Sequence, residues 1–81
     1  MMYSNKKVIV CGMARSGISA ALLLASQNAD VTLQDMKPMD ALEKIHDLDE
    51  LRKNGIKIFA GANPDDIIES FDYAVMSPGV P

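Results

Sequence analysis

Hydrophobic and polar positions follow two different periods along the chain, and together they predict four strands separated by three helical segments. Residues 7–11 end in a continuous apolar run, which is typical of a strand covered on both faces of a parallel sheet. Farther on, Ile18, Ala21, Leu22 and Ala25 recur at helical spacing and give the first helix one apolar face. The pattern predicts strands at 7–11, 30–35, 56–60 and 72–76, and helical segments at about 16–27, 40–53 and 63–70.

Turn and capping residues mark where these elements begin and end. Asn28 tolerates a positive φ, so it is expected to end the first helix. Asp40 and Glu43 have the spacing of a capping box at the start of the second helix, and Lys-Asn-Gly at 53–55 predicts its end. Residues 63–66, Asn-Pro-Asp-Asp, supply an N-cap, a proline at the first helical position and two acids near the positive end of the dipole. These signals predict a third helix of one or two turns.

The order β-α-β-α-β-α-β predicts a Rossmann-like α/β fold, an open parallel sheet of four strands flanked by helices. The expected strand order is 3-2-1-4, so a ligand crevice should open at the carboxyl ends of strands 1 and 4, where the winding reverses. No repeat or linker divides the chain, and we predict one domain over residues 1–81. Because residues 77–81 leave the last strand as a loop, we expect this domain to be a fragment of a larger protein.

Composition narrows the possible partners and compartments. The 81 residues carry a formal net charge of −3 with no basic cluster, which argues against nucleic-acid binding. A single cysteine excludes an internal disulfide and fits a reducing compartment. The longest apolar stretch, 18–25, is far shorter than the ~20 residues of a membrane span. We therefore expect a soluble, cytoplasmic protein with no membrane partner.

The strongest candidate for ligand chemistry is the loop between the first strand and the first helix, which has the frame G-x-A-x-x-G. Gly12 permits a tight turn, Gly17 permits close packing of helix on strand, and Ala14 replaces the usual middle glycine. With Arg15 and Ser16 at its mouth, this loop predicts a phosphate cradle at a helix N-terminus. The alternatives are a turn that binds nothing, an N-cap role for Ser16 and a solvated surface charge for Arg15.

Asp35 follows the second strand, 18 residues after Gly17. An acid at this position accepts hydrogen bonds from ribose hydroxyls in dinucleotide-binding domains, and it is equally suited to the imide N–H of a uracil. Lys37 is placed to flank a base or a phosphate, although either side chain is alternatively a solvated loop charge. Cys11 is expected to be a small buried hydrophobe and His46 a surface residue on a charged helix. No catalytic or metal-binding set of residues is recognisable in the sequence.

The last five residues, Ser-Pro-Gly-Val-Pro at 77–81, leave the fourth strand. Glycine exposes backbone N–H groups and the prolines stiffen the loop, which is expected to face the Gly12 loop across the crevice. Together with Gly-Met-Ala-Arg-Ser-Gly-Ile-Ser at 12–19 and Asp35 after the second strand, this loop resembles the N-terminal domain of the Mur ligases. The resemblance spans nearly the whole chain.

The resemblance implies that the domain holds the UDP part of the substrate and is the first of three domains. It is strongest to family members that add D-glutamate to UDP-N-acetylmuramoyl-L-alanine in peptidoglycan synthesis. ATP and Mg would act in other domains, so this fragment is expected to carry no cofactor or catalytic residue and to be inactive alone. The UDP-binding residues that the resemblance implies are Ala14, Arg15 and Ser16 for the diphosphate and ribose, Asp35, Met36 and Lys37 for the uracil, and Ser77, Pro78 and Gly79 for closing the site.

Two other interpretations remain open at this point. The first is the NAD-binding half-domain of a dehydrogenase or regulatory protein, against which Ala14 and the 77–81 loop argue. The second is a fragment that binds no nucleotide because its crevice is incomplete. If the chain is a fragment with residues missing, the fourth strand is an uncovered sheet edge, which invites self-association.

Overall fold

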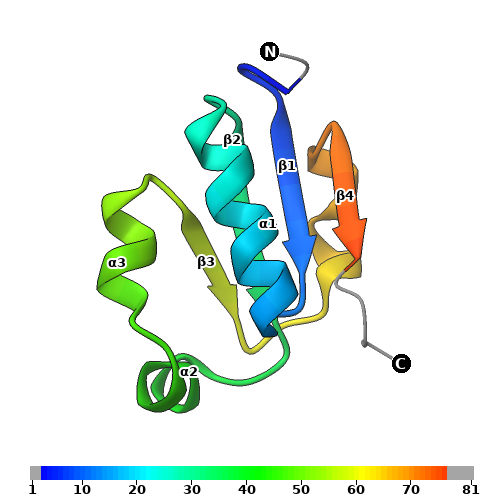
Figure 1. Ribbon diagram of the computed structural model, residues 1–81. Helices are drawn as coiled ribbons and strands as arrows, with labels where there is room; N and C mark the ends of the chain where they lie inside the picture. The colour runs from blue at the N-terminus through cyan, green and yellow to red at the C-terminus, as the bar shows by residue number, and fades with distance from the viewer. Residues whose placement is uncertain (1–2, 77–81) are drawn as a thin grey trace.

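The computed structural model describes residues 3–76 and has a four-stranded, all-parallel sheet in the order β3-β2-β1-β4, as predicted. The arrowheads of β1, β3 and β4 point the same way, toward the lower edge of the molecule in Figure 1. The elements are β1 (Lys7–Cys11), α1 (Arg15–Ser26), β2 (Asp30–Asp35), α2 (Met39–Ile45), α3 (Leu48–Lys53), β3 (Lys57–Ala60), the 3-10 turns η1 (Pro64–Asp66) and η2 (Ile68–Ser70), and β4 (Tyr73–Met76).

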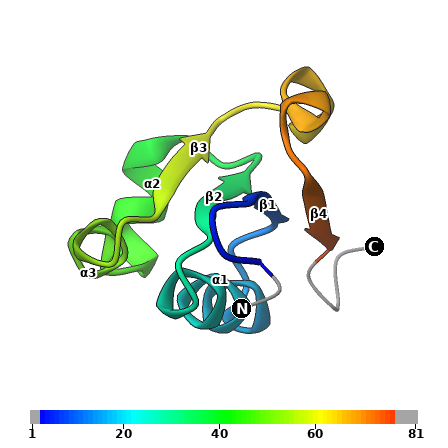
Figure 2. The same cartoon turned by 90° about the horizontal axis from the view of Figure 1, so that it is seen from above.

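The central strands β1 and β2 are covered on both faces, which confirms the interpretation of the apolar run at 7–11. Alternate residues of each strand point to opposite faces. Val10 and Leu33 belong to the core cluster beneath the helices, whereas the buried Ile9 and Gln34 lie on the opposite face. Figure 2 shows α1 on one side of the sheet and the η1–η2 segment on the other.

The first helix begins one residue earlier than predicted, so the alternative that Ser16 is its N-cap is wrong. Ala14 is the N-cap and makes no side-chain capping bond. At the other end Asn28 has φ 67°, as expected, and the N–H groups of Asn28 and Ala29 donate to Ala25 O (3.0 Å) and Leu24 O (3.2 Å). This is a Schellman motif, which satisfies the last carbonyls of the helix.

The predicted second helix is two helices, α2 and α3, and the capping box at Asp40 is wrong. α2 begins at Met39, so Asp40 lies inside the first turn and its carboxylate accepts from the neighbouring Ala41 N–H (3.0 Å). The break comes at His46, whose backbone is extended, followed by Asp47, whose carboxylate accepts from Glu50 N–H (3.2 Å). Capping by Asp47 satisfies a donor that would otherwise lack a partner, and so it stabilises a new helix start there. His46 is therefore a half-buried residue between two helices and does not lie on a helix.

The third predicted helix consists of two short 3-10 turns. Asn63 does act as the cap, since its Oδ1 accepts from Asp65 N–H (3.0 Å), and Pro64 occupies the first helical position. Ile67, with φ −130°, lies between the two 3-10 turns and interrupts the segment. The preceding strand, β3, starts at Lys57 and not at Ile56. The N–H of Ile56 donates to Leu51 O (3.2 Å) and so helps to close the end of α3.

Several contacts close the amino-terminal edge of the sheet. The backbone N–H of Asp72 donates to Lys7 O (2.8 Å), and the Asp72 carboxylate accepts from Lys7 N–H (2.8 Å). The rings of Tyr3 and Tyr73 meet edge to face, with 5.0 Å between their centroids. Asp72 thus pairs with Lys7 just outside β4, which begins one residue later than predicted.

Candidate functional site

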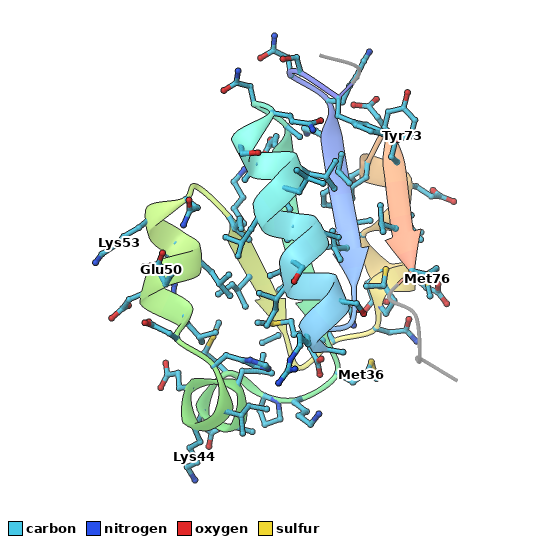
Figure 3. All side chains as sticks on the ribbon, viewed as in Figure 1. Met36, Lys44, Glu50, Lys53, Tyr73 and Met76 are labelled. Atoms are coloured by element: carbon cyan, nitrogen blue, oxygen red, sulfur yellow. The ribbon has the colours of Figure 1, made fainter. Side chains whose placement is uncertain are left out.

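The carboxyl ends of β1, β2 and β4 surround a cavity of about 270 Å³, where the strand order predicts a ligand crevice. Figure 3 shows Met36 and Met76 near this edge of the sheet, one after β2 and the other at the end of β4. The lining is mostly apolar. It consists of Cys11, Gly12, Gln34, Asp35, Met36, Pro64 and Met76.

The loop after β1 has the expected tight turn. Gly12 has φ 95°, a conformation that side chains other than hydrogen disfavour, and its N–H donates to Gln34 O (2.7 Å). Met13 is buried, Ala14 is extended, and Gly17 is buried against the sheet. The N–H groups of the first turn of α1 point out of the helix end, where they and the helix dipole favour an anion.

Asp35 connects the loop after β1 to the loop after β2. Its Oδ2 accepts from Met13 N–H (2.9 Å), and its Oδ1 accepts from Lys37 N–H (2.9 Å). Gly61 N–H donates to the backbone oxygens of both Asp35 (3.0 Å) and Lys37 (2.8 Å), so the loop after β3 is attached as well. Each carboxylate oxygen retains a further acceptor position, because an ionised carboxyl group offers about four. Asp35 is therefore a fixed acceptor and not a freely solvated acid.

The structure brings some of the predicted site residues to this cavity and leaves others outside it. Asp35 and Met36 line the cavity, whereas the exposed Ala14, Ser16 and Lys37 do not. Arg15 lines a separate hollow of about 410 Å³ on the flank of α1, together with Ile18, Ser19, Ile45 and His46. The predicted residues Ser77, Pro78 and Gly79 lie outside the described residues, so their roles stay predictions.

Four cavity residues have no counterpart in the sequence-based assignment: Cys11, Gln34, Pro64 and Met76. Gln34 is the most informative of them, because it is only 3% exposed and its Nε2 donates to Ala62 O (2.8 Å). The available signal was its place one residue before Asp35 in a strand buried on both faces. Cys11 is buried as expected, and burial, followed by the negative charge of Asp65, raises the pKa of its thiol.

Other features of the described chain do not offer a comparable site. A larger hollow of about 480 Å³ lies along α2 and α3, away from the strand ends, and is lined mainly by charged side chains. Among residues 3–76, no three His, Cys, Asp or Glu side chains gather in a way that could hold a metal ion. Within the same range, no helix is long and apolar enough to cross a membrane.

Comparison with known proteins identifies a family and several similar sequences. The sequence model of the family described as "Mur ligase MurD-like, N-terminal domain" matches residues 6–81. The chain is 45% identical to UDP-N-acetylmuramoylalanine–D-glutamate ligase of Streptococcus mutans over 80 residues, and 40% identical to the enzyme of that name from Listeria monocytogenes over 81 residues. These matches cover 98% and 99% of the chain but only 17% of each relative. The chain thus spans about a sixth of the length of these relatives, and both carry the name of a ligase and not of a dehydrogenase.

Proposed function

This chain belongs to the MurD-like N-terminal domain family of Mur ligases, and from that membership we propose that it binds the UDP moiety of UDP-N-acetylmuramoyl-L-alanine. It does so as part of a ligase that adds D-glutamate to this substrate in peptidoglycan synthesis. The observation that carries the proposal is the Asp35 carboxylate, which joins the loops after β1 and β2 beside a cavity at the switch point of the sheet.

The two halves of the nucleotide meet different chemistry at this edge of the sheet. The diphosphate takes the amino end of α1, with backbone N–H groups, the N-cap residue Ala14 and the first-turn residues Arg15 and Ser16. The uracil lies toward Asp35, Met36 and Lys37, over the mostly apolar cavity. Arg15 must leave its hollow on the flank of α1 to reach the diphosphate, and its exposed position in the first turn permits this. In the proposal, Ser77, Pro78 and Gly79 close the site from the end of β4.

The contribution of this domain to catalysis is positioning. Holding the nucleotide end of the substrate fixes the distant reacting carboxylate relative to the rest of the enzyme, and such fixation lowers the entropic part of the barrier. We propose that ATP and Mg act outside residues 1–81 and that the enzyme works in the cytoplasm.

Isothermal titration of the 81-residue chain with UDP, and separately with NAD, tests the proposal. UDP should bind and NAD should not. Binding of NAD alone would support the dehydrogenase alternative, and binding of neither ligand would contradict a nucleotide site.

The diphosphate contact is tested by Arg15→Ala, with Lys44→Ala as the matched control, because Lys44 projects from α2 away from the sheet (Figure 3). Arg15→Ala should weaken UDP binding about three- to thirtyfold and reduce its salt dependence, since a cation facing phosphate gives a screened attraction. Lys44→Ala should leave the affinity unchanged. Equal affinities of the two variants would remove Arg15 from the site.

The open edge of β4 supports the further proposal that the isolated domain self-associates. Among the described strands, β4 pairs with β1 alone, and Tyr73 and Met76 are 43% and 61% exposed. Sedimentation velocity over a range of concentrations should show a monomer–dimer equilibrium. An Ala74→Lys variant, which places a charge on the exposed edge, should shift that equilibrium toward the monomer. A concentration-independent monomer would refute this proposal.

A further inference from the structure

Gln34 places a buried polar group against the cavity at the carboxyl ends of the strands. It lies on β2, on the face of the sheet opposite α1, and is 97% removed from solvent. Its Nε2 donates to Ala62 O at 2.8 Å, in the loop between β3 and η1. Because a backbone carbonyl can only accept, the atom facing Ala62 must be the amide nitrogen, and this fixes the direction of the amide oxygen.

The amide oxygen of Gln34 has no hydrogen-bond partner among residues 3–76, and its only side-chain bond there is the one to Ala62. Within the same residues, no side-chain oxygen or nitrogen is both shielded from solvent and unpaired, so this oxygen is not sealed in the core. Gln34 is one of the residues that line the cavity, so this oxygen belongs to a side chain at the cavity wall. The cavity therefore contains an oriented acceptor with a vacant position.

The neighbours of Gln34 determine which ligand groups fit. Met36, Pro64 and Met76 give the cavity apolar walls, and a hydrogen bond in such surroundings is stronger than one in water. Asp35, the next residue, is also an acceptor, but each of its oxygens already receives one backbone N–H, of Met13 or of Lys37, whereas the amide oxygen of Gln34 receives none among residues 3–76. A ligand that fits here brings a flat apolar body with an N–H donor on its edge.

We propose that Gln34 Oε1 accepts the imide N–H of the uracil ring, which makes Gln34 a specificity-determining residue of the nucleotide site. This inference rests on the proposed function, because it assumes that the base of UDP enters the cavity. Uracil carries a single ring N–H at this edge, between two carbonyl oxygens, and this donor matches the vacant amide oxygen of Gln34. Asp35 then acts mainly as the positioning residue that holds the surrounding loops.

The test compares three ligands by isothermal titration against the 81-residue chain: UDP, N3-methyl-UDP and 5-methyl-UDP. The N3-methyl group removes the imide N–H, whereas the 5-methyl group adds the same bulk at another position of the ring. N3-methyl-UDP should bind about tenfold more weakly than UDP, within the range expected when a buried acceptor is left unpaired. The 5-methyl compound should bind within about threefold of UDP.

Two variants separate the acceptor from the anchor to Ala62. Gln34→Met and Gln34→Glu both lose the Nε2 donor, but only Gln34→Met also loses the acceptor. Gln34→Met should reduce the tenfold preference for UDP over N3-methyl-UDP to about twofold, whereas Gln34→Glu should retain a preference near tenfold. If Gln34→Met does not fold, the Gln34→Glu variant and the wild-type ligand series still decide the matter.

The outcomes distinguish this inference from the proposed function. If UDP binds and the wild-type chain accepts N3-methyl-UDP equally well, the role of Gln34 is refuted and the UDP site stands. If Gln34→Met keeps the full tenfold preference, or Gln34→Glu loses it, the acceptor is another group and the inference is likewise overturned. If UDP itself does not bind, the proposed function and this inference fail together.

Discussion

Replacing Asp35 with alanine removes a side chain that joins the loops after β1 and β2. Two backbone donors lose their acceptor, Met13 N–H in a partly buried position and Lys37 N–H in an exposed one. Water can replace the carboxylate at Lys37 but reaches the Met13 N–H less easily. The substitution therefore acts mainly through the Gly12 loop, and it does so even in the absence of ligand.

The expected magnitude follows from these two environments. Leaving a partly buried donor unsatisfied costs about 1–3 kcal/mol, whereas the exposed bond contributes a few tenths. The free energy of unfolding of Asp35→Ala should thus fall by about 1–3 kcal/mol, which corresponds to roughly 4–8 °C in melting temperature per kcal/mol for a domain of this size. UDP affinity should fall by about 1–3 kcal/mol as well, because the same carboxylate holds the loops around the base.

Urea unfolding followed by circular dichroism, together with titration of UDP, provides both measurements. Asp40→Ala is the matched control, since Asp40 is exposed and accepts only from the adjacent Ala41 N–H. That control should lie within about 0.5 kcal/mol of the wild-type chain in both assays. If Asp35→Ala and Asp40→Ala are indistinguishable in stability and in UDP affinity, the joining role of Asp35 is wrong.

Other predictions concern caps and the buried thiol. Asn28→Ala should lower the free energy of unfolding by about 1–2 kcal/mol, because Asn28 has φ 67° and alanine is strained in that conformation. Asn28→Gly should not lower it, and equal urea midpoints for the two variants would contradict this backbone strain. Asp47→Ala should lower the free energy of unfolding by about 0.5–2 kcal/mol because α3 loses its cap. Asp49→Ala, whose ion pair with Arg52 is exposed, should cost at most a few tenths of a kcal/mol. If urea unfolding gives the reverse order, the capping assignment is refuted. Because burial raises the pKa of the Cys11 thiol, iodoacetamide should alkylate the folded chain at about pH 8 at least about tenfold more slowly than the chain in urea. As pH rises, the unfolded chain loses the thiol proton of Cys11 before the folded chain does. The contribution of this thiol to stability should therefore be fully present below its ordinary pKa of 9.0 and fall as pH rises beyond it. Cys11→Ala should remove this fall in stability, and a fall that persists in the variant would have another source.

The strands and their order could be predicted from the sequence because burial on both faces leaves a direct pattern. The runs at 7–11 and 30–35 match β1 and β2 to the residue. The break between α2 and α3 was missed because Leu42, Leu48 and Leu51 are all buried and can be read as one apolar stripe. The competing signal was local, since Asp47 satisfies the N–H of Glu50 and so favours a new helix start.

The candidate site was predictable only in part. The position of Asp35 after a strand suggested a ligand acceptor, but its bond to Met13 depends on the register that sets Cys11 beside Gln34. Gln34 was missed because one polar residue in a strand usually faces solvent, whereas here its side chain is buried and its Nε2 donates to Ala62 O in the segment after β3. Arg15 is the first residue of α1, and because successive helical residues point about 100° apart, its direction depends on whether it belongs to the helix.

The pairing of Tyr3 with Tyr73 has a practical consequence for spectroscopy. The chain contains two tyrosines and no tryptophan, so its intrinsic ultraviolet emission arises from one edge-to-face couple. That couple sits at the start of β4, whereas the cavity opens at the other terminus of the same strand. Emission will therefore report melting of the sheet, and a bound nucleotide will register as a higher melting temperature and not as direct quenching.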